Sequence, residues 1–212
     1  MDGFQHILAE VDRIAVEHPH HVFIGGIAVY LHAVNNPATK DIAETSHDAD
    51  FMLALADFAE LRDTDEVVAN RRLSKHQLIR NGVEFDIYVE RQNKLLIPYD
   101  EAAAHRVPYG PIQVACLEHL VVLKLEALRD RLRSAKGDKD VRDLVTIARL
   151  SRQSLRPELA RPFIRDDHLE LLEQVHASPA FSYIARGNAH EAKGLRKIFS
   201  TFAARLGQRR SL

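Results

Sequence analysis

The sequence has little of what membrane, secreted or repeat proteins contain. Cys116 is the only cysteine among 212 residues, which excludes an internal disulfide bond and fits a reducing cytoplasm. No apolar run approaches the roughly 20 residues that a membrane-spanning helix needs, so no membrane partner is expected. The first residues are acidic and amphipathic rather than basic and then apolar, which argues against a signal peptide. These absences favour a globular cytoplasmic protein.

The composition is ordinary for a globular protein, but the charge is unevenly distributed. Hydrophobic residues make up 46% of the chain and charged residues 28%, enough for one core or for one core with a helical appendage. Residues 1–128 carry 11 Lys and Arg against 20 Asp and Glu, whereas residues 129–212 carry 18 against 10. An acidic front half and a basic back half fit a metal-binding part joined to an RNA- or partner-binding part. Solvated helix surfaces would explain the same charges without a partner.

Hydrophobic periodicity predicts a mixed α/β part followed by helices alone. Strands are expected over residues 21–24, 47–54, 67–70, 73–80, 83–90 and 112–115. Helices are expected over residues 3–17, 26–34, 56–62, 117–133, 139–150, 157–177 (whole or broken) and 189–207. Residues 91–111 are expected to be rich in loop, and Asn81-Gly82 predicts a tight hairpin. This order indicates an α/β (α+β) sheet domain over residues 1–115 and a helical domain over residues 116–212.

The stretch from Val22 to Phe51 combines a glycine turn with two acids. An apolar run, Gly25-Gly26 and an immediate helical period predict strand, turn and helix, a geometry that lets backbone amides approach a phosphate. Asp48 and Asp50 follow, and strand alternation would place both on one face, where a cation such as Mg²⁺ would relieve their repulsion. Asp-x-Asp is also common on solvated strand faces, although the apolar flanks argue for an internal strand.

Asp86 lies on a strand whose odd-numbered positions are apolar, so Glu84, Asp86 and Tyr88 are expected on the opposite face. An exposed acid on such a face needs no functional explanation. By sequence alone Asp86 is therefore a weaker candidate than the first two acids, and Glu84 is the next-best choice.

Lys124 interrupts an apolar helical stripe formed by Leu117, Val121 and Leu128. Such a lysine either snorkels to solvent or meets a buried carboxylate or phosphate. Asp140 and Asp143 share a face at the start of the next expected helix. Acids there would also complement the helix dipole, with Asp138 as a possible cap, so these two positions do not by themselves indicate a site.

Taken together, these residues resemble a known family. Gly25-Gly26 after a strand, a helix, and then Ser46-x-Asp48-x-Asp50 on the next strand resemble the nucleotidyltransferase fold. The later residues are similar to the AbiEii/MenT-like group of toxin and phage-defence nucleotidyltransferases, which carry a Lys-Leu-x-Ala helix, an arginine and Lys-Asp-x-x-Asp. Here these stand as Lys124-Leu125-Glu126-Ala127, Arg131 or Arg133, and Lys139-Asp140-Val141-Arg142-Asp143.

The resemblance covers roughly residues 20–150 and has one notable departure. The family often has a basic residue two positions before the Ser/Thr, where this chain has Glu44. A triphosphate would lose a positive contact there, for which Lys40 and Arg80 are the candidate replacements. The departure puts triphosphate affinity in question but not the fold.

The resemblance implies a mixed sheet flanked by helices, then a C-terminal helical bundle, and a transferase dependent on Mg²⁺ (or Mn²⁺). The enzyme would move a nucleoside monophosphate from an NTP to an RNA, such as a tRNA 3′ end, or to a protein hydroxyl. The setting would be abortive infection or a toxin–antitoxin system with a cognate antitoxin protein. These are implications of the family rather than of composition or spacing.

The resemblance also implies roles for individual residues. Asp48, Asp50 and Asp86 would hold the metal, and Gly25, Gly26 and Ser46 would seat the nucleotide. Lys124 would neutralise phosphate charge, and Asp140 or Asp143 would orient Lys124 or the acceptor.

Two other classes of function remain open at this point. One is a catalytically silent nucleotidyltransferase fold that acts as a binding partner, which Glu44 favours. The other is a metal-dependent phosphohydrolase that uses water as acceptor. Retention of the three acids and of Lys124 argues against the silent fold.

Overall fold

The computed structural model describes residues 3–208, and the chain divides into two compact units. The first unit holds the residues up to Leu31 together with Glu44–Cys116. The second unit holds His32–Ala43 and the residues from Leu117 onward. Among the helices within residues 3–208, none combines the length and the apolar character that crossing a bilayer requires.

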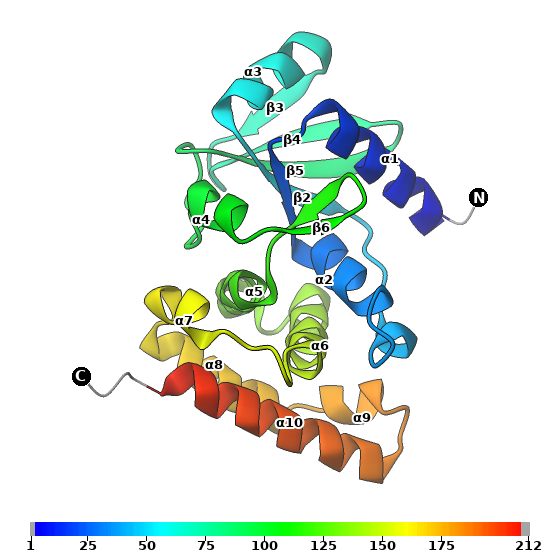
Figure 1. Ribbon diagram of the computed structural model, residues 1–212, viewed down its shortest axis with the longest axis vertical. Coiled ribbons are helices and arrows are strands. Elements are labelled where there is room, and N and C mark those ends of the chain that lie inside the picture. Colours follow the sequence, from blue (N-terminus) through cyan, green and yellow to red (C-terminus); the bar gives the residue numbers. More distant parts are fainter. Residues whose placement is uncertain (1–2, 209–212) are drawn as a thin grey trace. The chain divides into compact units, whose positions relative to one another are not determined.

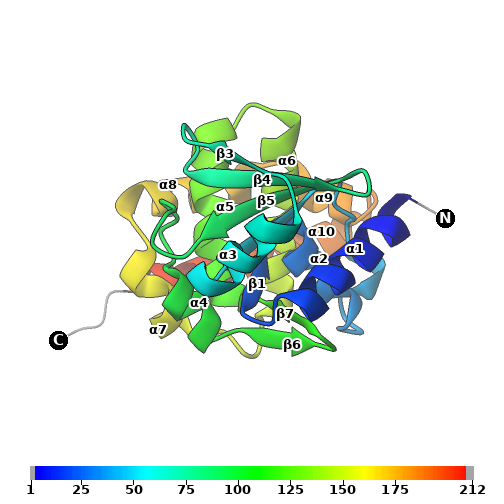
Figure 2. The same cartoon turned by 90° about the horizontal axis from the view of Figure 1, so that it is seen from above.

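A mixed sheet forms the centre of the first unit. Within the described residues it has seven strands in the order β3-β4-β5-β2-β1-β7-β6. The strands are β1 (His21–Ile24), β2 (Ala49–Leu53), β3 (Val67–Asn70), β4 (Lys75–Arg80), β5 (Val83–Val89), β6 (Val107–Tyr109) and β7 (Ile112–Val114). Strand β2 pairs antiparallel with β1 and parallel with β5, while β1 pairs parallel with β7. Figure 2 shows β3, β4, β5, β1, β7 and β6 following one another in this order, with α1 and α3 in front of the sheet.

The helices of the first unit contribute apolar side chains to its core. They are α1 (Gly3–Glu17), α2 (Gly25–Val34), whose last residues belong to the second unit, α3 (Leu55–Thr64) and α4 (Tyr99–Ala104). Helix α1 buries Phe4, Ile7, Val11 and Ile14, which recur every three or four residues as a core-facing stripe requires. The Phe4 ring packs edge-on against Tyr30 of α2 at 4.6 Å between centroids.

The core of the sheet is a run of phenylalanines across its three central strands. Phe23 on β1 lies 5.2 Å from Phe51 on β2, which lies 6.0 Å from Phe85 on β5, measured between ring centroids. All three side chains are buried. Because strands alternate their faces, burying these residues sends the intervening residues of β2 and β5 to the opposite face. Asp50 and Asp86 are two of those residues.

The second unit is entirely helical over its described residues outside the turns. Its elements are η1 (Lys40–Ile42), α5 (Leu117–Arg131), α6 (Ala135–Leu150), α7 (Pro157–Ala160), η2 (Arg161–Phe163), α8 (Asp166–Ala177), α9 (Ala180–Ile184) and α10 (Ala189–Gly207). Helices α5 and α6 pack on each other, and α10 packs on α6, α8 and α9 (Figure 1). The predicted fold class, an α/β sheet domain followed by a helical bundle, is confirmed.

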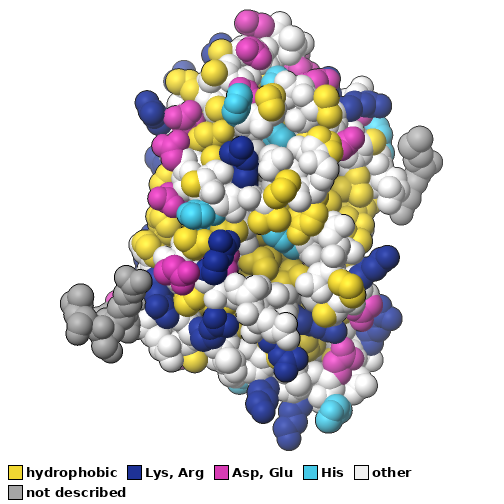
Figure 3. Space-filling view, in the orientation of Figure 1, with side chains coloured by type: hydrophobic (Ala, Val, Ile, Leu, Met, Phe, Trp, Pro, Cys, Tyr) yellow, Lys and Arg dark blue, Asp and Glu magenta, His cyan; other side chains and the backbone are white. Residues whose placement is uncertain are grey.

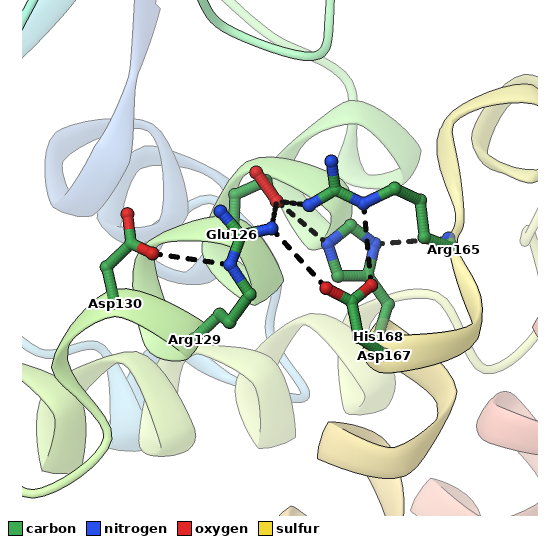
Figure 4. A network of polar contacts seen from close by, with 6 residues as sticks. All are labelled: Glu126, Arg129, Asp130, Arg165, Asp167 and His168. Carbon is green, nitrogen blue, oxygen red and sulfur yellow. Dashed lines mark hydrogen bonds and ion pairs between the residues drawn. The ribbon is translucent and has the colours of Figure 1, made fainter.

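A polar network joins α5 to the start of α8 (Figure 4). Glu126 on α5 pairs with Arg165, and its Oε1 atom lies 2.7 Å from Nη1 of Arg129. The Arg165 backbone N–H donates to Nδ1 of the fully buried His168, whose Nε2 lies 3.2 Å from Glu126 Oε1. Burial lowers the pKa of His168, an effect that outweighs the opposing influence of Glu126. The buried imidazole is therefore held in a neutral form that bridges two helices.

The observed elements differ from the expected ones in several places, each for a physical reason. Residues 91–111 are rich in loop but also contain α4 and β6; Gly110, at a φ of +62°, permits the tight turn into β7. Helix α6 begins at Ala135, where Ser134 caps it by accepting from the Gly137 N–H at 3.1 Å, so Asp138 lies in the first turn and is not the cap. The five residues of α9 are too few for a helical period to be visible in the sequence.

Candidate functional site

Gly25 forms the turn between β1 and α2 beside an acid of the neighbouring strand. Its φ of +66° lies in the left-handed region, which favours glycine. A Cβ at this position would overlap Oδ2 of Asp50 and would lie 3.1 Å from Asp50 Cγ. The antiparallel pairing of β1 with β2 causes this proximity, because it sets Ile24 opposite Asp50. The absence of a side chain at Gly25 therefore leaves space for the Asp50 carboxylate at the start of α2.

Asp50 and Asp86 are brought together by the sheet. They are directly paired residues of the parallel strands β2 and β5, so their side chains leave the same face next to each other. Both residues are half-buried. Two neighbouring carboxylates repel each other unless a cation lies near them. Glu84 lies on the same face of β5 but is exposed, so Asp86 is the acid aligned with Asp50.

A cation of the protein itself already contacts Asp86. Lys75 of β4 forms an ion pair with Asp86 Oδ2, and Gln77 Nε2 donates to Asp86 Oδ1 at 3.4 Å. Gln77 is the residue directly opposite Asp86 in the β4–β5 hairpin. The side chains of Lys75 and Asp86 are only 12% and 20% exposed. Both oxygens of this carboxylate are therefore engaged from the neighbouring strand.

Asp48 lies outside the strand on which the sequence analysis placed it. Strand β2 begins at Ala49, and Asp48 is in the bend that precedes it. The hydroxyl of the buried Ser46 donates to Asp48 Oδ1 at 3.2 Å. Such local side-chain bonds compete with strand pairing, which accounts for the later start of β2. The alternation argument is thus wrong for Asp48, although the residue lies only two positions before Asp50 in the chain.

By ligand type, the carboxylates and the Ser46 hydroxyl suit a hard divalent cation, which prefers oxygen ligands. Across residues 3–208, no three His, Cys, Asp or Glu side chains are arranged together as a metal-holding group. Of the three acids predicted to hold the metal, the sheet brings Asp50 and Asp86 next to each other. Gly25, which has no side chain, lies beside Asp50.

Arg80 is already committed to another partner. Its Nη2 donates to Glu17 of α1 at 2.9 Å, and its Nε lies 4.0 Å from Asp65. The hydrogen bond to Glu17 raises the pKa of Arg80. To supply the positive contact that is lost at Glu44, Arg80 would have to give up its ion pair with Glu17.

Lys124 of the second unit is buried, so the snorkelling alternative is excluded. Its side chain is 7% exposed, and Nζ lies 2.6 Å from Asp143 Oδ2 and 3.0 Å from Asp140 Oδ1. Burial lowers the pKa of Lys124, but the carboxylates of Asp143 and Asp140 more than offset this, so the pKa rises above its usual value. The amine is therefore a permanent positive charge at neutral pH.

Two further cations complete this cluster. Arg131 binds Asp140 in a bidentate manner, with Nε at 2.6 Å and Nη2 at 3.1 Å from its two oxygens. Lys139 lies 3.2 Å from Asp143 Oδ2. Of the two arginines considered in the sequence motif, Arg131 is thus the one that pairs with the motif acid. Bidentate geometry gives such pairs directional specificity as well as attraction.

Lys75 and Gln77 were missed by the sequence analysis, although a signal for them exists. If Asn81-Gly82 is a two-residue hairpin turn, the pairing of residues on either side is fixed. That register sets Arg80 opposite Val83 and Gln77 opposite Asp86, as is observed. Lys75 follows on the same face, because it is two residues from Gln77.

Comparison with known proteins gives a fold but no family. No protein-family model and no curated protein matches the sequence. The structure is similar to that of an antigenic nucleotidyltransferase-like protein from Paracoccidioides brasiliensis, with 17% identity, 84% of this chain and 91% of that chain covered, and a TM-score of 0.49. It is also similar to that of a protein from H. pylori named as a candidate nucleotidyltransferase, with 13% identity, 97% and 95% coverage and a TM-score of 0.50.

The chain has a nucleotidyltransferase-like fold. The second similarity, which spans nearly the full length of both proteins, carries this conclusion. At this level of identity it concerns the arrangement of helices and strands, and the chemistry has to be argued from the side chains.

Proposed function

We propose that this protein is a Mg²⁺-dependent nucleotidyltransferase that moves a nucleoside monophosphate from an NTP to a hydroxyl group. The observation that supports this most strongly is the direct pairing of Asp50 with Asp86 beside the glycine turn at Gly25. Transfer of this kind needs positioning and neutralisation of charge more than covalent assistance. The side-chain-free turn would help to position a phosphate group, and a cation bound by the carboxylates would neutralise its charge.

Each residue of the first unit has a distinct task in this proposal. The turn at Gly25 and the first amides of α2 receive a phosphate group, because a helix start favours anions. Asp50 and Asp86 provide oxygen ligands, and Ser46 orients Asp48 by donating to it. A bound divalent cation would neutralise phosphate charge and lower the pKa of the attacking hydroxyl.

The second unit contributes Lys124 to the proposal through the sequence resemblance. Its amine stays charged because Asp140 and Asp143 surround it. The resemblance assigns this amine to a phosphate group, which would bind it in competition with the two carboxylates. The AbiEii/MenT-like pattern also supports an RNA, such as a tRNA 3′ end, or a protein as acceptor. It favours a toxin or phage-defence role with an antitoxin as partner.

The test is a transfer assay with each of the four α-labelled NTPs, Mg²⁺ and total RNA or protein. We expect label to move to a macromolecule with wild type and the signal to fall at least about 100-fold in Asp50→Asn, as on loss of a charge-stabilising group. Glu84→Gln, which neutralises an exposed acid on the same sheet face, is the matched control and should keep activity.

Other outcomes of this assay would reject the proposal. Labelled nucleotide released to water without any acceptor product would indicate a phosphohydrolase. No turnover with any NTP and acceptor would favour the catalytically silent binding partner, which Glu44 also favours. Asp50→Asn with wild-type activity would remove the carboxylate pair from the chemistry.

A further inference from the structure

A cavity of about 370 Å³ lies in the second unit, between the end of α6 and one face of α10. Its residues on α10 include Gly194, Lys197, Thr201 and Arg205, which recur every three or four positions as one helix face requires. The volume is within the range of about 300–1,000 Å³ that small-molecule sites occupy. Ser151, at the end of α6, follows Asp143 of the Lys124 cluster by eight residues, or about 12 Å along a helix axis. The cavity is therefore separate from that cluster.

Three cations and no acid line this cavity, among the residues that the structure describes. The cations are Arg152, Lys197 and Arg205, and none of them forms an ion pair with another residue of the range 3–208. Nη2 of Arg205 donates to the Leu155 carbonyl at 2.7 Å, which fixes the guanidinium without compensating its charge. The cavity thus gathers positive charge that no described side chain neutralises.

Helix dipoles account for only part of this charge. Arg152 follows the last residue of α6, and Arg205 lies in the last turn of α10, where cations are favourable. The dipole effect falls off within the last turn, so it does not explain Lys197 in the middle of α10. A bound anion would explain all three cations together.

Two uncharged residues of the cavity also lack an explanation from packing. Gly194 lies inside α10, where glycine is unfavourable, yet a Cβ there would meet no atom within 4 Å. The absence of a side chain leaves this wall of the cavity open. Ser151 is 1% exposed, and its hydroxyl has no hydrogen-bond partner among the described residues. A buried hydroxyl without a partner is unfavourable, and an oxygen atom of a ligand would supply one.

We propose that this cavity binds the phosphate group of a small organic phosphate, such as a mononucleotide. A phosphate monoester carries a charge of about −1.5 to −2 at pH 7, which three cations suit better than the single charge of a carboxylate. The forked guanidinium groups of Arg152 and Arg205 match phosphate oxygens. Beside them, the buried side chains of Leu155 and Phe202 provide apolar surface for the rest of the ligand. The inference is independent of the proposed function, because it uses none of the residues assigned to transfer.

Isothermal titration calorimetry of the whole protein with a 5′-mononucleotide, in the presence of EDTA, tests the proposal. We expect Arg152→Gln to weaken binding at least roughly tenfold, as on loss of one hydrogen bond to a charged group. Arg133→Gln, which removes an exposed arginine from the turn between α5 and α6, is the matched control and should bind as wild type does. Asp50→Asn should also bind as wild type does. Inorganic phosphate should bind more weakly, because it has no apolar part.

Each other outcome would overturn the proposal. Wild type that binds neither the mononucleotide nor inorganic phosphate would exclude the site, and unchanged affinity in Arg152→Gln would place the binding elsewhere. Weaker binding in Asp50→Asn would assign it to the proposed transfer site. Binding of single-stranded RNA without binding of the mononucleotide would indicate a nucleic-acid surface instead. If circular dichroism shows that Arg152→Gln is unfolded, Gly194→Leu decides, because it keeps every charge and narrows the cavity. Wild-type affinity in Gly194→Leu would then refute the site.

Discussion

Gly25 is the residue where backbone conformation and the site depend on each other most directly. Alanine at this position would adopt a left-handed conformation, which costs about 1–2 kcal/mol for an L-residue, and its Cβ would collide with Asp50. We therefore expect Gly25→Ala to lower the free energy of unfolding by more than this strain and to abolish nucleotide binding. Urea denaturation measures the first effect.

Gly82 provides the control for this substitution. Its φ is +80°, but a Cβ there would meet nothing within 4 Å, so Gly82→Ala suffers the strain without the collision. Equal losses of stability in the two variants would show that Asp50 does not restrict position 25.

Lys124 is the second residue whose replacement separates two interpretations. In Lys124→Met, Asp140 keeps Arg131 and Asp143 keeps Lys139 as partners. We therefore expect a loss of stability below the about 3–5 kcal/mol of a fully unpaired buried charge. Turnover should fall by orders of magnitude, equivalent to about 3–4 kcal/mol of transition-state stabilisation.

Turnover is measured beside a circular-dichroism check of folding. Lys139→Met, which removes the half-buried lysine of the same cluster, should remain active. A folded Lys124→Met protein with wild-type turnover would mean that the cluster is purely structural.

At the scale of elements, the docking of α8 on α5 depends on a neutral histidine. Because burial lowers the pKa of His168, the unfolded chain takes up a proton before the folded one does as the pH falls. Stability from this group is thus complete above the unfolded pKa of about 6.5 and is lost as the pH falls below it. We expect the free energy of unfolding to decrease between pH 7.5 and 5.5.

His168→Gln should reduce this pH dependence without removing it, since burial also lowers the pKa of His21 and His76. His190→Gln, which removes an exposed imidazole at the start of α10, is the control for the loss of one histidine. Denaturant titrations at several pH values supply the data. An identical slope in wild type and His168→Gln would contradict a neutral bridging role.

The sequence predicts elements well where periodicity extends over enough residues. The strands of the central sheet and the long helices α1, α5 and α10 follow their apolar spacing closely. Segments such as α4, β6 and α9 are too short to show a period, and their conformation is set by neighbours or by a single glycine. Element boundaries near polar residues also shift, as at Asp48 and Ser134, because side-chain hydrogen bonds decide them.

The candidate site is predictable only in part for a related reason. The pairing of Asp50 with Asp86 depends on which strands are neighbours, and one strand's alternation does not contain that information. The ion pair between Lys75 and Asp86 depends on the register of the β4–β5 hairpin. The turn residues determine this register, but the hydrophobic pattern of either strand does not indicate it. Lys124 could be recognised from the sequence alone, because a charged residue within an apolar helical stripe is unusual.

At the scale of the whole molecule, the basic second half gives a prediction about RNA. Figure 3 shows Lys and Arg side chains over the region of α10, where Lys193 and Lys197 are exposed. If these residues contact RNA phosphates, binding should weaken steeply with salt because counterions are released. The double variant Lys193→Gln/Lys197→Gln should lower the log–log slope by roughly one per lost contact.

Filter binding at several KCl concentrations measures this slope. Arg91→Gln/Lys94→Gln removes the same charge from an exposed loop of the first unit and should leave the slope as it is. A nearly flat salt dependence in wild type would mean that the basic residues are ordinary solvated surface.

The parallel pairing of β1 with β7 has a consequence for synthesis on the ribosome. Phe23 pairs with Val114, about 90 residues later in the chain, and the Ala115 N–H donates to the Phe23 carbonyl at 2.9 Å. At translation rates of about 5–20 residues per second, roughly 5–18 s separate the two strands. During that interval one edge of β1 has no partner in the nascent polypeptide. Chaperone binding to ribosome-bound chains should therefore persist until residue 115 has left the exit tunnel.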